Sequence, residues 1–138
     1  MSETYQHKAA KILLANWLSE TEKESGDFCK LPPFEWRKNA GVHIELPIYE
    51  TSDPYYFETE DSKTNILFRP DITVFHKGAP IYIIEIFHTH ATKRSKLNLI
   101  KNYLVGFGGV EVHEVNTVDI LRHDKKPKII QTNIILVT

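Results

Sequence analysis

The sequence predicts a mixed α/β (α+β) domain in which helices flank a central mixed sheet, in the order α-β-β-β-α-β-β. Two segments repeat apolar residues at three- and four-residue spacing, which is typical of amphipathic helices, and the segments between and after them have the short apolar or alternating runs of strands. The chain has 138 residues, of which 41% are hydrophobic and 25% charged. These values are typical of one globular domain, so we expect residues 1–138 to form a single domain.

The first expected helix runs from Glu3 to about Glu24, capped by Ser2 or Thr4 and ended by Ser25-Gly26-Asp27. Its apolar face comprises Ala10, Leu13, Leu14, Trp17 and Leu18. Residues 27–40 contain prolines without a clear period and predict a loop. Alternation from Val42 predicts a half-buried strand to about Tyr49, and the polar, acidic residues 51–64 predict a surface loop.

Two β-rich runs, Ile66 to His76 and Ile81 to His88, are separated by Lys77-Gly78-Ala79-Pro80 and predict a hairpin. A second amphipathic helix is expected from Thr92 to Val105, ended by the glycines that follow. Its buried side is expected to carry Leu97, Ile100, Leu104 and Val105. Two more strands complete the chain, one over Val110, Val112 and Val115 and one from Ile129 to Val137.

Charge is distributed unevenly along the chain, although the formal net charge is −1. Residues 1–62 carry a net charge of −6 and residues 63–138 a net charge of +5. The basic half contains two clusters: Lys93, Arg94, Lys96 and Lys101, then Arg122, Lys125, Lys126 and Lys128. Such clusters are either a nucleic-acid footprint or ordinary solvated faces.

The single cysteine, Cys29, excludes an internal disulfide framework and a multi-cysteine zinc site, which favours a reducing compartment. We expect an intracellular protein, cytoplasmic or nucleoid-associated, because no apolar run approaches the ~20 residues that span a bilayer and no secretory signal is evident.

The strongest chemical signal is a pair of carboxylates on the expected hairpin. A register that pairs His76 with Pro80 places Asp71 directly opposite Glu85, with β-carbons about 5 Å apart. Two carboxylates at that distance repel by roughly 3 kcal/mol at an effective dielectric of about 20. A hard divalent cation removes this repulsion. The alternatives are a one-residue slip, which separates the two groups, or a lysine or arginine that pairs with Glu85.

Two strings carry a further signal: Arg69-Pro70-Asp71 and Glu85-Ile86-Phe87-His88-Thr89-His90, the second followed by a lysine-rich helix. With the order of elements, they resemble the PD-(D/E)xK nuclease superfamily, and in particular its competence-protein (CoiA-like) branch. The resemblance covers about Glu3 to Leu121. It implies a restriction-endonuclease-like domain that binds Mg²⁺ (or Mn²⁺) through Asp71, Glu85 and the main-chain carbonyl of Ile86.

The superfamily lysine that activates water normally follows the glutamate by two positions, where this sequence has Phe87. Such lysines can migrate, so Lys96, or else Lys93, is expected to reach back to the site from the second helix. His90 is an alternative proton-handling group, because an imidazole titrates near neutral pH.

The first helix of this superfamily often adds a polar residue to the site. His7 and Lys11 share one helix face and are the expected contributors, with Glu20 as a second candidate and solvent exposure as the alternative for each. Glu45 points either toward the carboxylate pair or to solvent. His88 and His90 form an H-x-H pair, which is too few ligands for zinc.

The sequence thus predicts a Mg²⁺-dependent nuclease that hydrolyses phosphodiester bonds, most readily as an endonuclease on DNA. Lys93, Arg94 and Lys101 are expected to bind the nucleic-acid backbone, and a homodimer is expected because cleavage of both strands suits two-fold symmetry. One alternative is a catalytically degenerate nucleic-acid-binding module of the same fold. The other is a domain in which Asp71 and Glu85 form only structural ion pairs.

Overall fold

The computed structural model describes residues 4–25, 31–36, 40–49 and 66–138, without the side chains of residues 21–25. The expectations for Ser2, Cys29, the acidic loop 51–64 and parts of the loop 27–40 lie outside the described residues. Of the helices described, none has the length and apolar character needed to cross a membrane.

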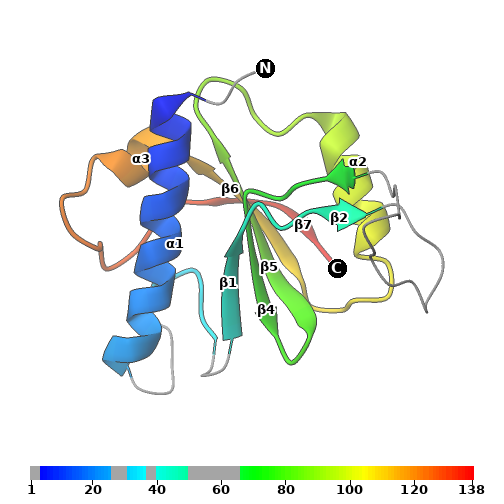
Figure 1. Ribbon diagram of the computed structural model, residues 1–138, viewed down its shortest axis with the longest axis horizontal. Coiled ribbons are helices and arrows are strands. Elements are labelled where there is room, and N and C mark those ends of the chain that lie inside the picture. The colour runs from blue at the N-terminus through cyan, green and yellow to red at the C-terminus, as the bar shows by residue number, and fades with distance from the viewer. Residues whose placement is uncertain (1–3, 26–30, 37–39, 50–65) are drawn as a thin grey trace, which may run out of the picture.

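A five-stranded mixed sheet flanked by helices forms the centre of the molecule, which confirms the predicted fold class (Figure 1). Its order is β1 (Ala40–Ile44), β4 (Ile72–His76), β5 (Ala79–Phe87), β6 (Glu111–Asn116) and β7 (Asn133–Val137). Strands β5 and β6 are parallel, and the other neighbouring pairs are antiparallel. A separate two-stranded sheet pairs β2 (Ile48–Tyr49) with β3 (Ile66–Phe68).

Helices cover both faces of the large sheet (Figure 1). On one face lie α1 (Tyr5–Ser25) and the short α3 (Thr117–Leu121), and on the other lies α2 (Arg94–Tyr103). Successive residues of a strand face opposite sides of its sheet. Accordingly Ile84 and Ile86 of β5 pack under α1, whereas Ile83 packs under α2.

The apolar face predicted for the first helix is confirmed, because its members are buried or packed against the core beneath α1. Of the two predicted caps, Ser2 and Thr4, only Thr4 lies within the described residues. Its Oγ1 accepts a 3.1 Å hydrogen bond from the main-chain N–H of His7, as a helix cap does. On α2, Ile100 and Leu104 are buried as predicted. Val105 is 77% exposed, contrary to the prediction, because the helix ends at Tyr103 and the chain turns there.

The predicted order of elements is incomplete. The strand expected from Val42 to Tyr49 divides into β1 and β2 because Glu45, between them, has a positive φ of 53°. The run from Ile66 to His76 divides into β3 and β4 at Arg69-Pro70-Asp71, where proline cannot donate to a ladder. The helix α3 was not predicted; it begins at Asn116, whose side chain accepts from Val118 N at 2.9 Å.

The β4–β5 hairpin has a shorter turn than predicted. Lys77 and Gly78 alone form it, with φ values of 54° and 77°, as in a type I′ turn. His76 therefore pairs with Ala79 rather than with Pro80. A bulge next to Pro80 absorbs one residue, so that Ile72 pairs with Ile84. Beyond the bulge the register is the predicted one. One residue past the Ile72–Ile84 pair, this register places Asp71 opposite Glu85.

The centre of β5 should contribute strongly to the stability of the fold. Ile84 has no exposed surface and packs under α1, so we expect Ile84→Ala to lower the free energy of unfolding by about 2–5 kcal/mol. Ile134 on β7 is 52% exposed, so Ile134→Ala serves as a matched control with a much smaller effect. Urea denaturation measures both, and equal losses would contradict the assignment of the core.

Candidate active site

Two hydrogen bonds that run in opposite directions join Asp71 to the Glu85–Ile86 segment of β5. The main-chain N–H of Asp71 donates to Glu85 Oε2 at 2.8 Å, and the main-chain N–H of Ile86 donates to Asp71 Oδ2 at 2.8 Å. Asp71 precedes β4 and Glu85 lies near the end of β5, so both carboxylates stand at one end of the sheet. This arrangement agrees with the face-sharing predicted from the sequence.

Both acids are removed from solvent: Asp71 is 8% exposed and Glu85 is 3% exposed. Burial, reinforced by the negative charge of Asp71, raises the pKa of Glu85 from its ordinary 4.5 to about 7. The ammonium group of Lys96 acts in the opposite sense and lowers this pKa without offsetting the other two effects. The carboxylates are thus close, buried and incompletely neutralised, which is the electrostatic character of functional sites.

Lys96 reaches the carboxylate pair from the first turn of α2. Its Nζ forms an ion pair with Glu85 Oε1, and its side chain is 30% exposed. Lys96 is on the same helix as Ile100, which anchors α2 against the sheet. The ammonium group of Lys96 therefore lies beside the carboxylate pair, as expected from the sequence, and Phe87 holds the position two residues after Glu85.

The start of α1 contributes two further side chains. His7 Nε2 lies 2.7 Å from the main-chain oxygen of Ile86 and 3.4 Å from Asp71 Oδ2. Because a carbonyl oxygen only accepts, Nε2 carries the proton in this hydrogen bond. Lys11 is 2% exposed, and its Nζ lies 3.0 Å from Glu45 Oε1 and 3.6 Å from Asp71 Oδ1.

Glu45 joins the site through Lys11, although it does not lie within a strand as expected. It follows β1 directly, and its main-chain N–H donates to the main-chain oxygen of Asp71 at 3.0 Å. The side chain is 52% exposed and pairs with the buried ammonium of Lys11. Glu45 thereby adds a third negative charge to a site that holds the ammonium groups of Lys11 and Lys96.

The donor set for a cation consists of oxygen atoms. It comprises the carboxylates of Asp71 and Glu85 with the main-chain carbonyl of Ile86, which fits Mg²⁺ or Mn²⁺ completed by water. Within residues 4–25, 31–36, 40–49 and 66–138, no group of three or more histidine, cysteine, aspartate or glutamate side chains has metal-binding geometry. This donor set does not suit a structural zinc site, which needs four ligands.

Several candidate residues do not contact the carboxylate pair. His90 is exposed in the segment between β5 and α2, and Glu20 is exposed on α1, about 13 Å along the helix from Lys11. Lys93, Arg94 and Lys101 are exposed at the start and along the length of α2. These three basic residues have the exposure that contact with a nucleic-acid backbone requires.

Glu114 is a buried carboxylate that sequence reasoning missed. It lies on β6 directly opposite Glu85, is 8% exposed, and accepts a hydrogen bond from the main-chain N–H of Thr92. The available signal was a charged residue inside a buried run, between His113 and Val115. Thr117 was missed as well; its hydroxyl donates to the main-chain oxygen of Phe87 at 3.0 Å and ties α3 to the end of β5.

Comparisons of the chain with protein-family models, with curated proteins and with solved structures found no match. The resemblance to the PD-(D/E)xK superfamily therefore stays a prediction from the residues.

The raised pKa of Glu85 predicts a pH dependence of stability. Between pH 4.5 and about pH 7 the folded protein holds a proton on Glu85 that the unfolded chain has lost, so stability falls as pH rises through this window. We expect a loss on the order of a few kcal/mol relative to the Glu85→Gln variant, which lacks this proton equilibrium. Urea denaturation of both proteins at several pH values measures the difference, and parallel stability curves would contradict it.

Proposed function

We propose that this protein is a divalent-metal-dependent nuclease that hydrolyses phosphodiester bonds, with DNA as the expected substrate. The observation that carries the proposal is the position of Lys96, whose ammonium group pairs with Glu85 from another element although Phe87 replaces the superfamily lysine. Two carboxylates, an oxygen donor from the main chain and an ammonium group then lie within one buried corner of the fold.

Each residue has a distinct part in the proposed reaction. Asp71, Glu85 and the Ile86 carbonyl would hold Mg²⁺, which supplies an activated water and stabilises charge on the phosphate. Lys96 would orient the attacking water and stabilise negative charge on the phosphate oxygens. His7 and Lys11 position the Ile86 carbonyl and the Asp71 carboxylate through the contacts described above.

The exposed basic residues of α2 support DNA as the partner. Lys93 and Arg94 lie at the start of the helix, less than one turn from Lys96. Lys101 lies about two turns after Lys93 and Arg94. Attraction of this kind acts on the phosphate backbone and is independent of base sequence. A two-fold dimer would bring two such sites to opposite strands and is the assembly we expect for double-strand cleavage.

The alternative of a degenerate nucleic-acid-binding module also has an observation in its favour. Lys11 and Lys96 already place positive charge against the outward oxygens of Asp71 and Glu85. In such a module these pairs would be structural, and DNA would bind through α2 without being cleaved.

Cleavage assays separate the two proposals. The wild-type protein, incubated with plasmid, linear, single-stranded or branched DNA, is expected to cleave with Mg²⁺ or Mn²⁺ and not with EDTA. Asp71→Asn should abolish cleavage, and Lys96→Met should slow it by at least about 100-fold, since it removes a group that stabilises the transition state. Lys77→Met, at the exposed hairpin turn, is the matched control and should leave the rate unchanged.

A protein that binds DNA but cleaves none of these substrates with either metal would establish the degenerate module instead. Cleavage that persists in Asp71→Asn would show that the carboxylate pair is not the site.

Metal binding can be measured without cleavage. Because Mg²⁺ binds only the folded protein in this proposal, it should stabilise the wild type by about 3 kcal/mol at a hundredfold excess over its Kd. The melting temperature should then rise by several degrees in the wild type and not in Asp71→Asn. No rise in the wild type with either Mg²⁺ or Mn²⁺ would favour purely structural ion pairs.

A further inference from the structure

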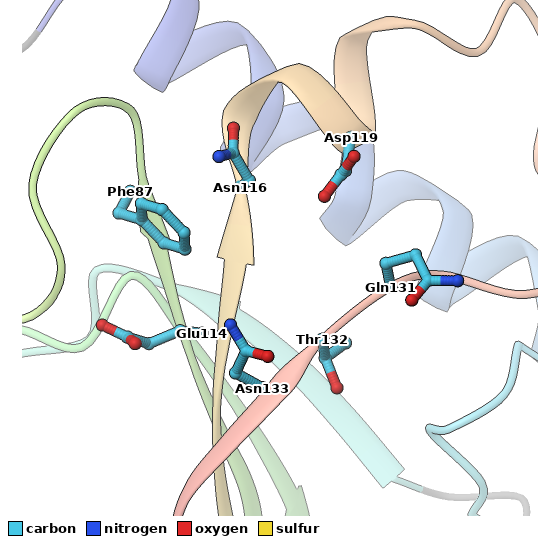
Figure 2. Close-up of a pocket in the computed structure, with 7 residues that line it drawn as sticks. All are labelled: Phe87, Glu114, Asn116, Asp119, Gln131, Thr132 and Asn133. Atoms are coloured by element: carbon cyan, nitrogen blue, oxygen red, sulfur yellow. The ribbon is translucent and has the colours of Figure 1, made fainter.

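A polar hollow of about 290 Å³ opens beside the carboxylate pair, between the ends of β5, β6 and β7 and the helix α3 (Figure 2). It is lined by Phe87, Glu114, Asn116, Asp119, Gln131, Thr132 and Asn133. Figure 2 shows the Phe87 ring and the Glu114 carboxylate on one side of the hollow and the Asp119 carboxylate, which extends from α3, on the other. Its volume is at the small end of ligand pockets, roughly 300–1,000 Å³, and suits one flat ring system.

The sheet register connects this hollow to the proposed active site. On the parallel strands β5 and β6, Glu85 pairs with Glu114, and Phe87 pairs with Asn116. The main chain at Glu114 is therefore one strand spacing, about 5 Å, from the main chain at Glu85, whose carboxylate pairs with Lys96. The hollow lies beyond the carboxyl ends of two adjacent parallel strands, which is where α/β sheets commonly bind ligands.

The lining favours a neutral ligand that donates hydrogen bonds. Glu114 is more than nine-tenths buried, and one of its oxygens accepts from the main-chain N–H of Thr92. Its other oxygen has no hydrogen-bond partner within the described part of the chain. Asp119 adds a second carboxylate, whose nearest cation is Arg122 at 3.9 Å. None of the described residues that line the hollow is a lysine or arginine, so the lining disfavours a phosphate group.

The other lining groups suit the face and edge of a heterocycle. Phe87 provides an aromatic ring on which a base can stack. Gln131 and Asn133 provide amides, which both donate and accept. The hydroxyl of Thr132 is held by the buried His113, whose Nδ1 lies 2.8 Å from it. A carboxylate is the side chain that accepts from an exocyclic amino group, such as N4 of cytosine.

We propose that this hollow binds one unpaired nucleobase of a DNA strand whose phosphate lies at the carboxylate pair, and that it prefers a base with an exocyclic amino group. The proposal rests on the function proposed above and specifies the substrate. A base can enter only when it is unpaired and unstacked, because pairing in a duplex occupies its hydrogen-bonding edge and stacking covers its faces. The substrate class is therefore single-stranded DNA or the unpaired arm of a branched or frayed end.

The test is a measurement of base preference by fluorescence anisotropy, with labelled homopolymers of deoxycytidine and of thymidine in EDTA, so that nothing is cleaved. The wild type should bind the deoxycytidine strand at least about fivefold more tightly, as expected for one good contact to a base edge. A duplex that contains the same cytosines should show no such preference over other duplexes of equal length.

The informative quantity is the ratio of the two dissociation constants. Removal of any negative charge strengthens binding to every DNA strand alike, so affinity alone would mislead. Glu114→Gln should bring the ratio close to one, because the amide donates to thymine O4 as readily as it accepts from cytosine N4. Asp119→Asn should also lower the ratio. The same change at Asp124, which is exposed and outside the hollow, is the matched control and should preserve it.

Phe87→Leu tests the stacking surface separately. It should weaken binding of both homopolymers by at least about fivefold, because stacking on an aromatic ring is worth roughly 1–3 kcal/mol per base. Thermal melting of each variant verifies that the fold is retained, and a variant that fails to fold is replaced at the same position by Glu114→Ala or Phe87→Met.

The outcomes separate this inference from the proposed nuclease activity. Metal-dependent cleavage combined with equal binding of the two homopolymers would overturn the inference and leave the nuclease in place. A preference for deoxycytidine that depends on Glu114, without cleavage, would support the inference within the degenerate module. Failure to bind either homopolymer, or a preference that survives Glu114→Gln, would overturn it.

Discussion

The two opposed hydrogen bonds between main chain and carboxylate hold the start of β4 against the end of β5. They satisfy two buried N–H groups at a point where Pro70 ends the regular ladder, and an unsatisfied buried N–H is costly. This role accounts for one oxygen of Asp71 and one of Glu85 in structural terms alone. The other two oxygens, Asp71 Oδ1 and Glu85 Oε1, face Lys11 and Lys96.

The charges around these oxygens make the site electrostatically expensive. Burial of two carboxylates side by side costs desolvation as well as mutual repulsion, and a buried ion pair seldom repays the whole of that cost. The pKa of Glu85 is raised to about 7 despite the adjacent Lys96, which indicates that the attraction to Lys96 does not fully offset the cost of burial and repulsion. An apolar pair would avoid this desolvation and repulsion but would leave the two main-chain N–H groups that the carboxylates accept from unsatisfied. The two main-chain hydrogen bonds offset part of this cost, and the metal proposed above would offset more, since a divalent cation removes the repulsion between the carboxylates.

Local pattern was enough to predict the carboxylate pair, but not its surroundings. Asp71 and Glu85 belong to one hairpin, so the alternation of side chains along each strand and a short turn determine that they face each other. The turn length and the bulge were missed because they depend on Lys77 adopting a positive φ. Lys96 could be predicted because its place on the helix follows from its apolar neighbours. The position of Glu114 opposite Glu85 could not be predicted, because β5 and β6 are parallel strands joined across α2, and no turn sets their register. The hollow needs β7 and α3 as well, so it depends on contacts that are distant in the sequence.

The start of α2 connects the carboxylate pair with the hollow. Thr92 donates its main-chain N–H to Glu114, and Lys96 pairs with Glu85, so one short segment contacts the acid of each strand. The charges on the two sides of this segment differ: lysines surround the carboxylate pair, whereas carboxylates and amides line the hollow. A nucleotide has the same division, with a negative phosphate and a neutral base that donates hydrogen bonds. A displacement of residues 92–96 would alter the Thr92–Glu114 and Lys96–Glu85 contacts together, because the two residues lie four apart in the chain. In the two proposals, binding of a base and positioning of a phosphate both depend on this one segment of the fold.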